Sequence, residues 1–61
     1  MLYLVEVLRT KAHEEPETMY RKFVDEDRAE DFADLWEGIC KDDREAGKID
    51  GYSIIVFQSK Y

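Results

Sequence analysis

Carboxylates are the most abundant side chains in this sequence that could take part in catalysis or binding, and many of them lie in one stretch. Residues 25–37, DEDRAEDFADLWE, contain seven Asp and Glu residues in thirteen positions. Paired carboxylates can act as general acid and base, but only when a pocket removes them from water. A chain of 61 residues buries only about 60% of its unfolded surface, which leaves little room for a pocket. The sequence therefore predicts a protein that is not an enzyme.

The single histidine and the single cysteine offer no alternative catalytic site. His13 begins HEEPE, residues 13–17, which resembles the start of a zinc-protease helix. Pro16 and the lack of a second histidine remove the metal geometry of that motif. Cys40 can form no intrachain disulfide, and no further histidine is present to activate it, so we expect a buried, inert thiol. We expect no metal and no cofactor.

Charge and composition limit the possible partners and the location. The net charge of −6 opposes direct binding to a nucleic-acid backbone and suits a basic partner. The first residues, MLYLVEVLR, lack the basic start of a signal peptide and are interrupted by Glu6. No stretch approaches the roughly 20 apolar residues that span a membrane. These features, with one free thiol, predict a cytoplasmic protein.

Hydrophobic spacing predicts three strands and one helix within a single domain, residues 1–61. Residues 2–10 and 52–61 are rich in apolar and β-branched side chains and are predicted strands. Residues 18–24 alternate poorly but carry Thr, Tyr, Phe and Val, which predicts a further strand, and Met19–Phe23 also allow the start of a helix. Residues 26–46 have the apolar period of an amphipathic helix. The element order indicates an α+β fold of type β-β-α-β, with a three-stranded antiparallel sheet in order 2-1-3 and one helix packed on one face.

The helix carries recognisable end signals. Asp25 is a good N-cap, and Asp27 with Glu30 offers an alternative capping box. Gly47 suits the left-handed residue that ends a helix, and Gly38 inside the helix costs up to about 1 kcal/mol relative to Ala. Trp36 is predicted to anchor the helix in the core. The predicted apolar face contains Ala29, Phe32, Ala33, Trp36, Ile39 and Cys40, with Leu35 at its margin.

One helix covers only one face of such a sheet, so apolar side chains remain on the other face. The predicted covered side is Tyr3, Val5 and Val7 with Ile55, Phe57 and Phe23 or Val24. The predicted surplus, and candidate dimer interface, is Leu2, Leu4, Leu8, Ile54 and Val56. A reversed register changes the members of this surplus without removing it. Small soluble proteins rarely expose a large apolar patch, which predicts a homodimer. The alternative is a monomer in which residues 11–17 or Tyr61 cover the face.

The acidic outer side of the helix is the candidate surface for another protein. Its members are Asp27, Glu30, Asp31, Asp34, Glu37, Asp42 and Glu45. The favoured function is a small homodimeric protein-interaction module, such as a phage or mobile-element inhibitor or regulator of another protein. The alternative is a nucleic-acid mimic that blocks a DNA- or RNA-binding protein. A purely solvated helix face is the simplest explanation, because Lys41 and Arg44 interrupt the row and Arg28 and Lys48 flank it.

Overall fold

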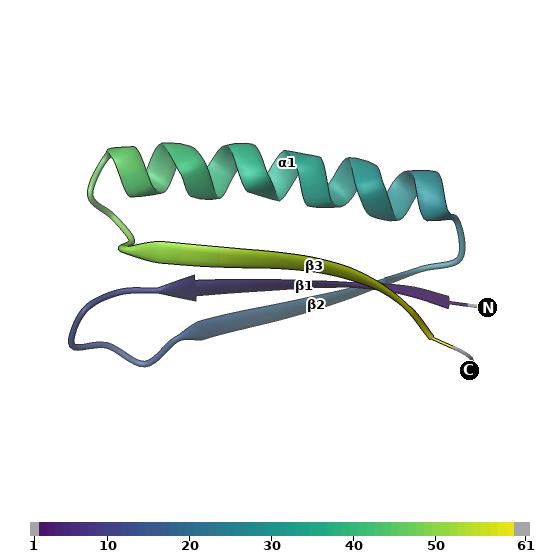
Figure 1. The fold of residues 1–61 in the computed structure, drawn as a ribbon, viewed down its shortest axis with the longest axis horizontal. Coiled ribbons are helices and arrows are strands. Elements are labelled where there is room, and N and C mark those ends of the chain that lie inside the picture. Colours follow the sequence, from purple (N-terminus) through teal and green to yellow (C-terminus); the bar gives the residue numbers. More distant parts are fainter. Residues whose placement is uncertain (1, 60–61) are drawn as a thin grey trace.

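The chain forms two layers, a three-stranded antiparallel sheet and one helix that lies along one face of it (Figure 1). The computed structural model describes residues 2–59. The elements are β1 (Leu2–Thr10), β2 (Glu17–Phe23), α1 (Glu26–Glu45) and β3 (Gly51–Ser59), and the strand order is β2-β1-β3. The predicted α+β fold and sheet order are confirmed.

The second strand resolves an ambiguity of the sequence. Residues 17–23 pair with β1 along their whole length, with Met19 opposite Val7 and Phe23 opposite Tyr3. The alternative, in which a helix begins in this segment, is therefore wrong. Each element boundary lies within about one residue of its prediction, except that residues 60 and 61 of the predicted last strand lie outside the described residues.

The start of α1 is fixed by a side-chain cap. Asp25 has an extended backbone, and its carboxylate accepts a hydrogen bond of 3.0 Å from the backbone N–H of Asp27. This bond satisfies a donor that has no partner within the helix. The helix thus begins two residues before the alternative capping box of Asp27 and Glu30. Gly38 is exposed, and a Cβ added there would meet nothing within 4 Å, so no close approach within the chain requires glycine.

The end of α1 follows the predicted glycine signal. Gly47 has a φ of 79°, the left-handed region that glycine adopts at little cost. Its N–H donates to the carbonyl of Arg44 at 3.1 Å, and the N–H of Lys48 donates to the carbonyl of Asp43 at 2.8 Å. This pair of bonds is a Schellman motif. It turns the chain back towards the sheet within a few residues.

Small side chains form the contact line between helix and sheet. Ala29 and Cys40 of α1 are fully buried, as are Val5 and Val7 of β1 to within 1%. Small residues allow the helix backbone to approach the sheet closely, so larger side chains of α1 lie to either side of this line. The buried core is Val5, Val7, Ala29, Ala33, Cys40 and Ile49, surrounded by the partly buried Tyr3, Met19, Phe23, Phe32, Trp36, Tyr52 and Ile54.

Trp36 packs against the core, as predicted, but less deeply than a fully buried tryptophan. It is half-buried and lies at the β2 side of the helix rather than in the centre of the core. Its ring contacts that of Phe32 at 6.2 Å between centroids, and Phe32 contacts Phe23 at 5.2 Å. These tilted pairs lie in the favourable range for aromatic rings. The three rings link α1 to the end of β2.

The faces of β3 are opposite to those predicted. Val56 is the cross-strand partner of Val5, and Ile54 is the partner of Val7. Directly opposed residues of an antiparallel pair point to the same side of the sheet. Ile54 and Val56 therefore lie on the helix side, and their assignment to the face opposite the helix is wrong.

The connection before β3 explains this register. The backbone N–H of Asp50 donates to the carbonyl of Thr10 at 2.8 Å, and the Asp50 carboxylate accepts a hydrogen bond from the backbone N–H of Ala12. These bonds hold Gly51 opposite Thr10. A shift of one residue would turn every β3 side chain to the other face. The choice of face is thus made by contacts of Asp50 and not by the strand itself.

Candidate interaction surfaces

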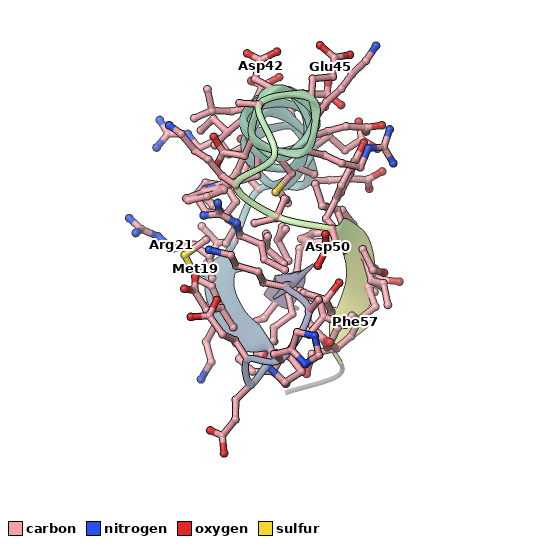
Figure 2. All side chains as sticks on the ribbon, turned by 90° about the vertical axis from the view of Figure 1, so that its left-hand side faces the viewer. Met19, Arg21, Asp42, Glu45, Asp50 and Phe57 are labelled. Carbon is pink, nitrogen blue, oxygen red and sulfur yellow. The ribbon has the colours of Figure 1, made fainter. Side chains whose placement is uncertain are left out.

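The seven predicted acidic residues of α1 are all exposed. Asp42 and Glu45 extend from the side of the helix that points away from the sheet (Figure 2). Side chains three or four positions apart on a helix stand about 5–6 Å from each other, so the carboxylates from Asp27 to Glu37 form a charged strip, which is interrupted before Asp42. The structure thus places these residues where a partner can reach them, with Arg28 and Lys41 exposed among them.

The strip does not follow a single line. Glu30 lies on the β3 flank of α1, where it lines a hollow together with Glu26, Val56 and Phe57. Tyr3 and Gln58 complete the lining, and the amide of Gln58 donates to the Tyr3 hydroxyl at 3.4 Å. Two carboxylates therefore border an apolar part of β3 and do not face bulk solvent on every side.

An ion pair that the sequence did not suggest joins α1 to β1. The Arg9 guanidinium lies 2.5 Å from the Asp43 carboxylate, and both side chains are only about one-fifth exposed. Asp43 differs from its acidic neighbours because it lies on the sheet side of the helix. Helical spacing separates it from Asp42, because Asp43 follows the buried Cys40 by three positions, but spacing along the helix does not identify Arg9 as its partner.

Arg9 also borders a hollow at the β2 side. This hollow is lined by Val7, Arg9, Glu17, Thr18, Met19 and Trp36. Among the described residues, the Arg9 Nε is buried without a hydrogen-bond partner. Figure 2 shows Met19 on this side of the molecule. The guanidinium is already neutralised by Asp43, so the hollow offers mainly apolar surface.

The Cys40 thiol is buried, whereas the His13 imidazole is exposed. Burial raises the pKa of the Cys40 thiol, an effect that the nearby Arg9 charge opposes and the Asp43 charge reinforces. A raised pKa lowers the thiolate fraction at neutral pH, so Cys40 is a poor nucleophile. His13 lies in the exposed loop between β1 and β2 with a φ of 67°. Within residues 2–59, no group of three His, Cys, Asp or Glu residues is placed to bind a metal ion.

The side of the sheet opposite α1 has an apolar surface, which we call the open face. Figure 2 shows the helix above one side of the sheet, with Phe57 on β3 away from it. Ile55 is 48% exposed and Phe57 is 42% exposed. By cross-strand register, the open face contains Leu2, Leu4, Leu8, Tyr20, Ile55 and Phe57. The predicted surplus therefore exists, with Ile55 and Phe57 in the places predicted for Ile54 and Val56.

A charged residue interrupts the open face. Glu6 of β1 lies opposite Tyr20 on one side and Ile55 on the other. Lys22, opposite Leu4, points to the same side of the sheet. The apolar residues of the open face thus surround a central carboxylate and do not form an unbroken surface.

Comparisons of the chain with protein-family models, with curated proteins and with solved structures found no match. Among residues 2–59, no helix combines the length and the apolar composition needed to cross a membrane. The surfaces described above are therefore the basis for a functional proposal.

Proposed function

We propose that this chain is a non-enzymatic protein-interaction module that forms a homodimer in the cytoplasm and regulates or inhibits another protein. The observation that carries this proposal is the exposure of Ile55, Val56 and Phe57, at 48%, 39% and 42%. Three consecutive large apolar residues in one strand seldom stay in contact with water in a stable monomer. A second copy of the chain is the commonest cover for such a surface.

The size of the molecule supports the same conclusion. A chain of this length gains only about 3–5 kcal/mol from its own core without a further staple. Its fully buried side chains are small, namely valine, alanine and cysteine. Cys40 is a free thiol, so no disulfide adds stability. Association buries additional apolar area and raises the apparent stability by mass action.

The proposal predicts a dimer in solution that resists salt. Static light scattering at several chain concentrations, in low and high salt, should give about twice the chain mass of 7.3 kDa. Apolar contacts are not screened by ions, whereas contacts between exposed charges are. A mass of one chain at every concentration tested would contradict the proposal. A dimer that dissociates in high salt would show that charge contacts dominate instead.

The alternative function is a nucleic-acid mimic that presents the acidic strip of α1 to a basic groove of another protein. The exposure of all seven carboxylates favours it. Against it, exposed basic side chains interrupt the strip, and the net charge of −6 is modest for a mimic. In a phage or mobile-element setting, either function would inhibit a host protein, so the two need a direct test.

Reversing two charges separates the alternatives. The variant Asp31→Lys/Asp34→Lys should keep its fold, because exposed helix positions usually change stability by no more than about 0.5 kcal/mol each. If the chain is a mimic, the parent displaces labelled duplex DNA from a basic DNA-binding protein, and displacement falls steeply with salt. The variant loses two carboxylates and gains two opposing charges, so it should lower that salt dependence by at least about two charge equivalents. Displacement that is equal for both proteins, or independent of salt, would exclude the mimic.

A further inference from the structure

The two edges of the sheet differ in charge. β2 follows Pro16 and carries Glu17, Arg21 and Lys22. β3 contains neither a charged residue nor a proline in its nine positions. Folded proteins commonly protect edge strands with charges and proline, because an unprotected edge can pair with another strand. Of the two edges, only β2 has this protection.

The exposed side chains of β3 lie on both of its faces. Ile55 and Phe57 belong to the open face, whereas Val56 points to the helix side and is still 39% exposed. A partner that covers the open face would leave Val56 in water. A strand placed beside β3 would bring its own side chains next to all three residues, because paired strands extend both faces of a sheet.

Contact between two open faces is also disfavoured by charge. Such a contact would remove Glu6 and Lys22 from water, since both point to that side. Burying an ionised side chain costs several kcal/mol unless its charge is well paired. Among the described residues no ion pair joins these two side chains. Edge pairing leaves both of them at the surface.

We propose that β3 pairs antiparallel with β3 of a second copy, about a two-fold axis that passes midway between the Ile55 residues of the two copies. This inference rests on the proposed function and identifies the surface that forms the dimer. Ile55 is the midpoint of Gly51–Ser59, so pairing about it uses the full length of the strand. The axis stands perpendicular to the sheet, which makes a six-stranded sheet with both helices on the same side.

This register places apolar side chains against each other on both faces. Ile55 lies opposite Ile55 of the second copy on the open face. Val56 lies opposite Ile54 of the second copy on the helix side, where both continue the row of Val5 and Val7. Phe57 lies opposite Ser53 of the second copy, a small residue that leaves space for the ring. No charged residue enters the new pair of strands.

The same axis brings opposite charges of the two helices together. α1 runs in the opposite direction to β3 (Figure 1). Glu26 and Glu30, near its start, border the hollow beside Gln58, and Arg44, near its end, lies 5.2 Å above the ring of Tyr52. Pairing about Ile55 sets Tyr52 of the second copy opposite Gln58. Arg44 of the second copy therefore arrives beside Glu26 and Glu30.

The charged contacts between the two helices affect the register of the paired β3 strands more than they raise the affinity of the dimer. Exposed ion pairs each change an equilibrium constant by no more than about fivefold. Helical spacing places Glu37 on the same flank of α1, between Glu30 and Arg44, so the dimer also brings two carboxylates nearer to the axis. The apolar β3 pair supplies the attraction, and the Arg44 contacts select the antiparallel arrangement over a shifted one.

Cysteine cross-linking tests the position of the axis. The thiols of two Ile55→Cys chains would lie directly opposite, at the Cα separation of about 4.5–5.5 Å that a disulfide accepts. The control is Tyr20→Cys, which is more exposed in the parent, at 58%. Its two thiols would lie about five strand spacings apart, roughly 24 Å. The parent, with Cys40 buried, gives the background rate.

Mild oxidation of dilute protein should link Ile55→Cys roughly a hundredfold faster than Tyr20→Cys, because pairing places the thiols at an effective concentration of about mM. If the two variants cross-link at equal rates and light scattering shows a dimer, pairing through β3 is wrong. The proposal of a homodimer is then unaffected. A parent that is monomeric at every concentration would overturn both. Circular dichroism shows whether each variant is folded.

A charge exchange tests the helix contacts without altering β3. Glu30→Arg and Arg44→Glu should each weaken the dimer about two- to fivefold, and the double variant should return to within about twofold of the parent. Asp31→Arg makes the same charge change on the side of α1 away from the sheet and should have a smaller effect. Single variants that weaken the dimer without recovery in the double variant would contradict this register.

Discussion

Replacing Val5 by Ala is expected to lower the free energy of unfolding by about 2–3 kcal/mol, which is most of the stability that a core of this size supplies. Val5 is 0% exposed and lies in the central strand under the helix. Removing two methyl groups would leave a cavity, because the strand is paired on both sides and the other fully buried side chains are small. Urea unfolding followed by circular dichroism measures the loss.

The matched control for this variant is Val56→Ala. Val56 is the direct cross-strand partner of Val5 but is 39% exposed. The same chemical change should therefore cost less than about 1 kcal/mol when the measurement is made at the lowest practical chain concentration. Equal losses at the two positions would mean that Val56 is covered under those conditions or that Val5 is not the centre of the core.

Replacing Trp36 by Ala is the second variant with a large expected effect, a loss of about 2–3 kcal/mol. This is below the range of about 3–5 kcal/mol for a fully buried tryptophan, because the ring is only half-buried. The substitution removes the ring contact with Phe32 and one wall of the hollow beside Met19. Thermal melting by circular dichroism is the suitable measurement, since the variant has no tryptophan fluorescence.

Leu35→Ala serves as the control for Trp36→Ala. Leu35 is the adjacent helix residue and is 60% exposed. Its truncation should change stability by no more than about 0.5 kcal/mol. A Trp36→Ala variant that melts with the parent would show that the β2 flank of α1 contributes little to the fold. In the parent protein, the Trp36 ring would then be available as a contact for a partner.

Local signals were sufficient to predict the elements and their order. The period of the apolar residues identified α1, and Asp25 and Gly47 marked its two ends within one residue. These signals act over a few residues and do not depend on the rest of the fold. The strand order followed from the short list of topologies that connect such elements without crossing.

The faces of β3 could not be predicted for a physical reason. The strand alternates between two sets that are almost equally apolar, one containing Ile54 and Val56 and the other containing Ile55 and Phe57. Hydrophobicity therefore gave no preference for one side. Hydrogen bonds of Asp50 to the end of β1 and to Ala12 decide the register, and these join residues about 40 positions apart. A local pattern contains no information about them.

The sequence predicted the acidic strip, but it did not predict the ion pair of Arg9 or the depth of Trp36. The acidic strip was found because exposure on a helix follows its period. The ion pair of Arg9 with Asp43 was missed because it depends on where the end of the helix crosses β1. Trp36 was placed too deeply, since the sequence does not show that Ala29 and Ala33 occupy the line of closest approach.

The unequal edges of the sheet also limit how far it can grow. A protein with two unprotected edges can add copies without end, which is how ordered fibrils extend. Here the charges of β2 make that edge a poor template, while β3 lacks them. Once two copies join through β3, both outer edges are β2. The proposed assembly is complete at two chains, and it would allow an uncharged, β-rich segment to persist in this sequence without leading to filaments.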